Sequence, residues 1–122
     1  MSKKTAVVIF SDPKTETEEA LGRVFNGLAA AYDFKEAGED VKIIFQGAGT
    51  RWVEQLQKPD HMLHALYTAV ADKIEGVSCG CVDAFGANAS GFDLVTDNKV
   101  PGTSGLSSFV KLRKEGFNTL IF

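Results

Sequence analysis

The 122-residue sequence contains few cysteines and prolines and has no long apolar run. Two cysteines cannot form a disulfide framework, so we expect a reducing, cytoplasmic location. The longest apolar runs are about five residues, whereas ~20 are needed to span a bilayer, and the N-terminus shows no signal-peptide pattern. The net charge of −3 excludes an electrostatic surface for nucleic acid or for an anionic membrane.

The residues that are present predict a single domain over residues 1–122. Hydrophobic residues make up 44% and charged residues 24%, a balance typical of a folded chain. Short apolar runs, typical of strands covered on both faces, alternate with segments of helical periodicity. This order predicts a three-layer α/β/α sandwich with a mostly parallel, flavodoxin-like sheet of about five strands.

The predicted strands cover residues 6–10, 41–45, 77–80, 92–95 and 117–122. The predicted helices cover residues 15–37, 50–56, 60–73, 82–87 and 105–115. We expect Thr15 or Thr17 to cap the first helix and Gly38 to end it. The apolar stripes of three helices are predicted to be buried: Leu21, Val24, Phe25, Leu28, Ala31 and Tyr32; Met62, Leu63, Leu66, Ala69 and Val70; and Leu106, Phe109 and Val110.

Both cysteines lie at one predicted strand-to-helix turn, in residues 77–86 (VSCGCVDAFG). Loops at the carboxyl ends of parallel strands collect ligands and reactive groups. A thiol at a helix N-terminus lies near free N–H groups and the positive end of the helix dipole, which stabilise a thiolate or a persulfide anion. We place Cys79 in the strand as an inert residue and Cys81 at the turn as the functional thiol. The carboxylate of Asp83 opposes this effect.

Other arrangements of the same residues remain open at this point. A disulfide between Cys79 and Cys81 requires the turn to distort, because residues two apart in a strand point to opposite faces. The two cysteines with His61 and His64 form an alternative metal set, although Cys-x-Cys spacing fits structural zinc poorly. His64 is also a candidate proton carrier at the cysteine edge.

Residues 47–52 (GAGTRW) partly match a dinucleotide-binding fingerprint. The third glycine is missing and the segment follows the second predicted strand rather than the first. We therefore predict a tight turn, with Arg51 lining the pocket as a cation, and no bound cofactor.

Residues 81–86 (CVDAFG) resemble the Cys-x-Asp-Ala-Arg-Gly turn of the DsrE/DsrF-like family. The resemblance extends to the Phe45-Gln46-Gly47 turn, the helix with the two histidines and the short apolar strand at the end. It implies a flavodoxin-like fold, rings such as trimers or hexamers, and a persulfide-carrying cysteine that corresponds to Cys81. Phe85 stands where the family has arginine, and Cys79 stands two residues before Cys81 rather than three.

These observations predict an intracellular sulfur-relay protein that resembles a persulfide carrier or sulfurtransferase. Cys81 is the expected sulfur-bearing nucleophile with Asp83 beside it, and Cys79, His64 and Arg51 are supporting candidates. Sulfur donor and acceptor proteins are the expected partners. The alternatives are a non-catalytic oligomeric module that binds a small ligand or a partner, and a metal or flavin site.

An aromatic surface buried between subunits is a further expectation. Phe34 lies off the apolar stripe of its predicted helix and either faces a partner subunit or is simply exposed. With Phe122 and a total of nine phenylalanines, it favours a homo-oligomer.

Overall fold

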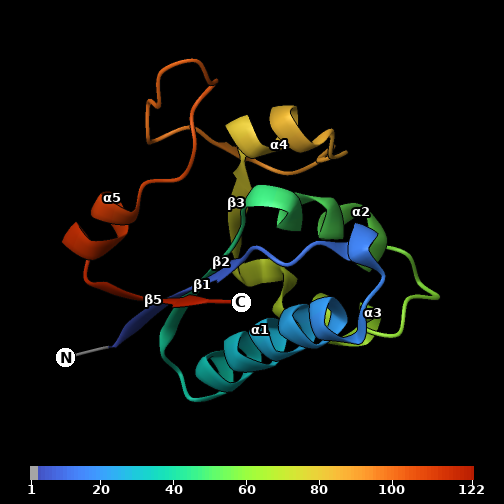
Figure 1. The fold of residues 1–122 in the computed structure, drawn as a ribbon. Coiled ribbons are helices and arrows are strands. Elements are labelled where there is room, and N and C mark those ends of the chain that lie inside the picture. The colour runs from blue at the N-terminus through green and yellow to red at the C-terminus, as the bar shows by residue number, and fades with distance from the viewer. Residues whose placement is uncertain (1–2) are drawn as a thin grey trace.

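The computed structural model describes residues 3–122. Five parallel strands form one sheet in the order β4-β3-β2-β1-β5 (Figure 1). The strands are β1 (Lys4–Ile9), β2 (Asp40–Phe45), β3 (Ile74–Ser78), β4 (Leu94–Val95) and β5 (Phe117–Ile121). The helices are α1 (Glu18–Glu36), α2 (Trp52–Leu56), α3 (His64–Val70), α4 (Cys79–Phe85) and α5 (Phe109–Lys114). Three 3₁₀ turns are η1 (Pro13–Thr15), η2 (Gly47–Arg51) and η3 (Ala71–Lys73). The predicted α/β fold with a flavodoxin-like sheet is confirmed.

Helix α1 begins after the predicted cap residue Thr17 and ends before the predicted terminal glycine Gly38. The hydroxyl of Thr17 accepts a hydrogen bond from the Ala20 N–H at 3.1 Å, and Gly38 takes a left-handed φ of 76° after the last turn. The centre of the predicted stripe is buried, whereas Phe25 and Tyr32 at its flank are 47% and 42% exposed. Phe34 was predicted either to face a partner subunit or to be exposed, but it is partly buried and packs against the core of its own chain.

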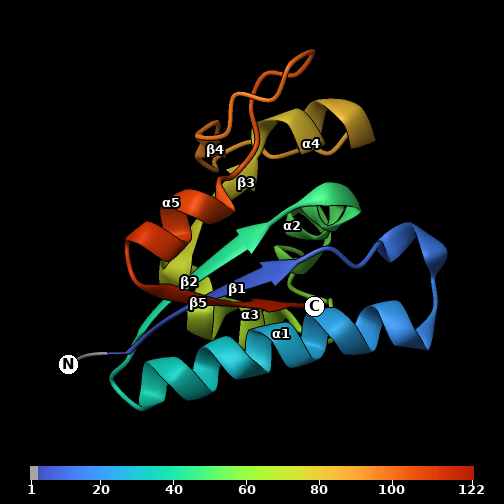
Figure 2. The same cartoon turned by 60° about the vertical axis from the view of Figure 1, so that its left-hand side comes forward.

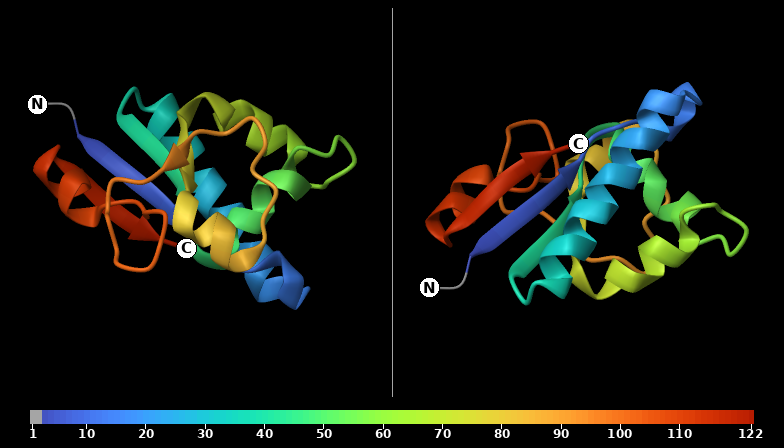
Figure 3. Two further views of the ribbon diagram at one scale, coloured as in Figure 1. Left: turned by 90° about the horizontal axis from the view of Figure 1, so that it is seen from above. Right: turned by 90° about the horizontal axis from the view of Figure 1, so that it is seen from below.

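The two faces of the sheet are covered unequally. Helices α1, α2 and α3 pack on one face around Val7, Ile9 and Phe45. The other face holds a smaller core, in which Leu112 of α5 covers Val8 and Ile44 (Figures 2 and 3). Parallel sheets are normally covered on both faces, so the single short helix on this side leaves part of the sheet near β5 open.

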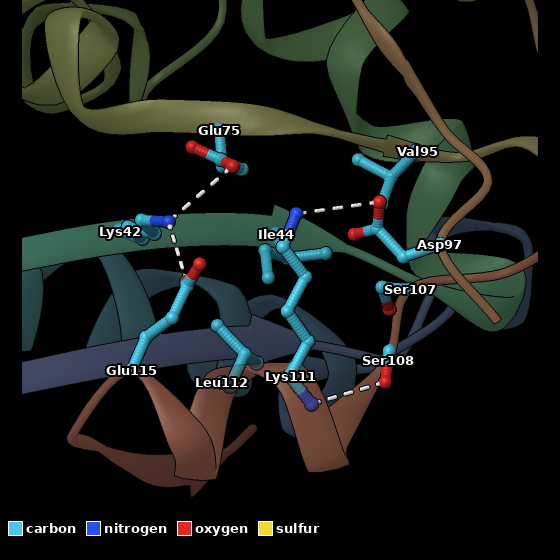
Figure 4. A pocket seen from close by; sticks show the side chains of 10 residues that line it. All are labelled: Lys42, Ile44, Glu75, Val95, Asp97, Ser107, Ser108, Lys111, Leu112 and Glu115. Atoms are coloured by element: carbon cyan, nitrogen blue, oxygen red, sulfur yellow. Dashed lines mark hydrogen bonds and ion pairs between the residues drawn. The ribbon is translucent and has the colours of Figure 1, made fainter.

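Charged side chains seal the rim between α5 and the sheet (Figure 4). Lys42 lies between Glu75 and Glu115, with Nζ–Oε1 distances of 3.4 and 3.6 Å. Lys111 of α5 lies 3.4 Å from Asp97. The pocket that these residues line has about 10 Å³ of free space, which is room for roughly one water molecule. It is therefore a closed structural contact rather than a ligand site.

Strand β3 begins earlier than predicted, and this shifts the position of the first cysteine. The predicted strand starts at residue 77 and leaves Gly76 between it and the preceding helix, but Gly76 lies inside the strand. A Cβ at this position would lie 2.7 Å from the Asp93 carbonyl oxygen and 2.7 Å from Val95, so the close approach of β4 requires glycine. The strand ends at Ser78, and the placement of Cys79 within it is wrong: Cys79 is the first residue of α4.

Two predicted helices are shorter than their apolar patterns. The last helix was expected from residue 105, but Gly105 has a φ of 108° and Leu106 pairs with Asn98. The hydroxyl of Ser108 accepts a hydrogen bond from the Lys111 N–H and caps the start of α5. The helix buries Leu112. Phe109 and Val110, which were predicted to point inward, are 42% and 51% exposed. Similarly, α3 begins at His64, so Met62 stands in the preceding turn and is 72% exposed.

Within residues 3–122, none of the helices has the length and apolar character needed to cross a membrane.

Candidate functional site

The carboxyl ends of β1, β2 and β3 lead into η1, η2 and α4, and Arg51 joins all three segments. Its Nη1 lies 3.1 and 3.0 Å from the two carboxylate oxygens of Asp12, after β1. Its Nε donates to the carbonyl oxygen of Phe85 in α4 at 3.1 Å, and its guanidinium lies 5.4 Å from the centre of the Phe85 ring. Arg51 was predicted as a cation at this edge, and it lies there, but Asp12 already balances its charge.

Asp12 is held in its ionised form by the same contacts. Partial burial raises the pKa of Asp12, but the Lys14 backbone N–H and the Arg51 guanidinium outweigh it and bring this pKa below the usual 3.8. Neighbouring Trp52 donates its indole N–H to the Ser11 carbonyl oxygen at 2.8 Å. The loops after β1 and β2 are therefore tied together by a charged and a neutral hydrogen bond.

The two thiols lie in the first turn of α4, and both are free. Cys81 is only 6% exposed, whereas Cys79 is half-buried. Successive helical residues are rotated by about 100°, so the two side chains leave the helix about 200° apart. Sequence analysis assigned the inert role to Cys79 and the functional role to Cys81, but Cys79 is the thiol that solvent reaches more easily.

Asp83 lies on the side of Cys79 rather than that of Cys81, because residues four apart share a helix face and residues two apart do not. Its carboxylate accepts a hydrogen bond from the Ser104 hydroxyl at 2.5 Å. The Gly80 N–H, one of the donors expected to face a sulfur anion, donates to the Gly105 carbonyl oxygen at 2.6 Å. The loop before α5 thus occupies part of the helix start.

The histidines take their hydrogen bonds from other partners. The Nδ1 of His64 lies 2.8 Å from the Leu56 carbonyl oxygen, and Nδ1 of His61 accepts from the Leu63 N–H at 3.0 Å. No hydrogen bond in residues 3–122 joins either ring to α4. Across the same described residues, no three His, Cys, Asp or Glu side chains gather as metal ligands would, so the alternative set of two cysteines and two histidines is not formed.

Sequence reasoning missed two features of this edge. Asp12 is not among the predicted site residues, although its position shortly after a buried strand is a signal for such a site. Ser78 is fully buried next to Cys79, and its hydroxyl has no hydrogen-bond partner in the described part of the chain. Nothing in the sequence distinguishes this serine from one that caps a helix.

Comparison with known proteins identifies the chain at family level. No curated protein and no solved structure matches the chain. A model of the DsrE/DsrF-like family matches residues 3–122, essentially the whole chain, and this family suggests a role related to sulfur relay. The match agrees with the parallel sheet and with the cysteine turn at its carboxyl edge. The chain therefore belongs to the DsrE/DsrF-like family.

Proposed function

We propose that the protein is a sulfur carrier in which Cys81 holds sulfane sulfur as a persulfide. The observation that carries this proposal is the position of Cys81 in the first turn of α4, at the carboxyl end of β3, in a chain that the family model matches throughout. Reactive groups in open parallel sheets collect at this edge. Cys79 and Asp83, on a different face of the same helix, would support Cys81 without bonding to the sulfur. Arg51 would hold the helix through Phe85, and His64, bonded to Leu56, would have no direct contact with the sulfur.

The transfer needs no external oxidant. The Cys81 thiol loses its proton, and the thiolate attacks the outer sulfur of a persulfide on a donor protein. One S–S bond forms at Cys81 while the S–S bond of the donor breaks, and the donor leaves as a thiolate that takes up a proton. Passing the sulfur to an acceptor thiol repeats the same exchange with the roles reversed.

Burial sets a condition on this chemistry. Cys81 is 6% exposed, so an attacking donor reaches its sulfur only when part of the surrounding structure moves. Thiolate reactivity depends on access as well as on charge. We therefore expect slow loading of Cys81 in the closed protein and faster loading when the structure packed around Cys81 opens.

Intact-mass measurement after incubation with inorganic polysulfide tests the assignment. We expect wild-type protein to gain the mass of sulfur, released by a reducing agent, and Cys81→Ser to gain none. Cys79→Ser is the matched control, since it removes the neighbouring thiol, and it should still load. Loading that survives Cys81→Ser but disappears in Cys79→Ser would move the role to Cys79, and no loading of any form would refute the sulfur-carrier proposal.

The low exposure of Cys81 favours a second candidate function. A thiol that reacts with nothing in the folded protein would leave a non-catalytic module that binds a small ligand or a partner at the same edge. Resistance of both cysteines to thiol reagents and to polysulfide would favour this alternative.

We also propose that the chain forms a homo-oligomer, a trimer or hexamer as in its family. Phe34 and Phe122 support this less than expected, because both pack partly buried against their own core. The support comes instead from exposed large apolar side chains: Phe10, Phe109 and Ile121 are 38%, 42% and 55% exposed. Exposed apolar surface of this kind is typical of subunit interfaces.

Light scattering tests this proposal. Wild-type protein should have the mass of several chains, and Ile121→Asp at the β5 edge should reduce it. Leu94→Asp, at the opposite edge of the sheet and 48% exposed, is the control and should keep the wild-type mass. A monomeric wild-type protein would contradict the proposal.

A further inference from the structure

Residues 99–105, called the strap below, lie against the first turn of α4. The strap rises beside α4 in orange in Figures 1 and 2. Its base is held by Asn98 and Leu106, which exchange two backbone hydrogen bonds of 2.7 and 2.9 Å. Above the base, the Gly105 carbonyl oxygen accepts from the Gly80 N–H at 2.6 Å, and the Ser104 hydroxyl donates to Asp83 at 2.5 Å.

Gly80, the residue between the two cysteines, allows the strap to come this close. A Cβ at Gly80 would lie 2.7 Å from Cδ1 of Leu106 and 3.2 Å from the Gly105 carbonyl oxygen. Gly80 has no left-handed φ, so backbone conformation alone does not require glycine here. The glycine of the Cys-Gly-Cys segment is therefore explained by the contact with the strap.

The strap itself is lightly held. Residues 101–104 are exposed, and Gly102 has a φ of 80°, which only glycine adopts readily. Beside these contacts, an open pocket of about 420 Å³ is lined by residues of both the strap and the helix: Gly80, Asp83, Ala84, Gly102, Thr103 and Ser104. Segments with exposed backbone and few buried apolar contacts open at low free-energy cost compared with global unfolding.

We propose that the strap is a lid over the first turn of α4 and that its opening controls access to Cys79. Opening breaks the Gly80–Gly105 and Asp83–Ser104 hydrogen bonds, frees the Gly80 N–H and uncovers the helix face shared by Cys79 and Asp83. The paired backbone of Asn98 and Leu106 stays as the fixed base. The role of the lid in sulfur transfer rests on the proposed function, but its control of thiol access does not.

Ser104→Ala tests the lid by removing one of the two hydrogen bonds above the base. We expect iodoacetamide to modify Cys79 about three- to tenfold faster, the range that corresponds to one net hydrogen bond. The Gly80 amide should lose hydrogen-exchange protection by a similar factor. Ser90→Ala, the same substitution at an exposed serine after α4, is the control and should react at the wild-type rate.

Gly80→Ala is a second variant, because its Cβ would lie 3.2 Å from the Gly105 carbonyl oxygen and 3.3 Å from Cβ of Thr103, so the strap has to move away from the helix, and we expect faster labelling here as well. Reaction rates measured at increasing low urea concentrations separate strap opening from global unfolding, since only global unfolding exposes enough surface to respond steeply to urea. A flat dependence is expected. A steep dependence, or equal labelling and equal Gly80 exchange in wild type, Ser104→Ala and Ser90→Ala, would overturn the lid.

Polysulfide loading of the same variants keeps the two proposals apart. If Ser104→Ala speeds labelling but no form of the protein gains sulfur, the lid stands and the sulfur-carrier function fails. If wild-type protein loads sulfur on Cys81 but the strap variants label at the wild-type rate, the function stands and the lid fails.

Discussion

Replacing Arg51 by alanine removes the side chain that connects the ends of β1, β2 and α4. The Arg51 and Asp12 side chains are 20% and 27% exposed, so their ion pair is only partly screened by water. A hydrogen bond to a charged group contributes about 1.5–3 kcal/mol, and we take the lower half because of this exposure. The contact with the half-exposed Phe85 ring adds about 0.5–1 kcal/mol. Arg51→Ala should therefore lower the free energy of unfolding by about 2–3 kcal/mol, or the Tm by about 8–12 °C.

Urea unfolding followed by tryptophan fluorescence measures this loss, because the single tryptophan, Trp52, lies beside Arg51 in the sequence and is 3% exposed. Arg23→Ala is the matched control: its ion pair with Glu19 joins side chains that are 57% and 75% exposed, so the change should stay below about 0.5 kcal/mol. Asp12→Asn in combination with Arg51→Ala should show a coupling energy of about 1–2 kcal/mol. A loss for Arg51→Ala no larger than that of the control, or strictly additive single substitutions, would refute the reasoning.

Three further predictions concern the same edge of the sheet. Gly49→Ala should lower the free energy of unfolding, measured in urea, by about 3 kcal/mol or more, because its Cβ would overlap the Ile9 carbonyl oxygen. Gly22→Ala, which has open space around it, should instead stabilise α1 by about 0.5–1 kcal/mol. The lowered pKa of Asp12 stabilises the fold at pH values above the unfolded pKa of about 4, and this contribution is lost as the pH falls through the lower folded pKa. Arg51→Ala should therefore reduce the fall of Tm on the acid side, and a fall of Tm with pH as steep as that of the wild type would contradict this. Mild oxidation should form no disulfide within a chain, because the two cysteines leave α4 about 200° apart; a mass loss of two hydrogens per chain would contradict the helical placement.

The sequence was most informative where local pattern and tertiary packing agree. Strand β1 contains the apolar run from Ala6 to Ile9, and β2 is apolar from Val41 to Phe45 apart from Lys42. Helix α1 has a cap, a period and a terminal glycine that all indicate one helix. Each of these elements was predicted within a few residues. Their signals are local, so no knowledge of neighbouring segments was needed.

The errors arose where a distant segment decides the local structure. Gly76 resembles a break, but the β4 backbone beside it requires a residue without a Cβ inside the strand. Leu106 fits a helical stripe, but its pairing with Asn98 and the φ of Gly105 exclude a helix there. The same long-range effects determined the site: the cysteine turn was found from the sequence, but the partners of Arg51 and Gly80 lie in segments that no spacing rule connects to them.

Helix α4 is held differently at its two ends, and the difference bears on how the cysteines are reached. At its C-terminal end, Phe85 is bound by Arg51, which is itself fixed by the ionised Asp12. At its N-terminal end, Gly80 is bound by an exposed strap, which also binds Asp83 nearly one turn further along. Because the firmer attachment lies at the end away from the thiols, opening of the strap would uncover Cys79 without displacing the helix. Arg51→Ala should consequently have its main effect on the free energy of unfolding and little effect on the thiol-labelling rate at low urea. Ser104→Ala should have its main effect on the labelling rate and little effect on the free energy of unfolding.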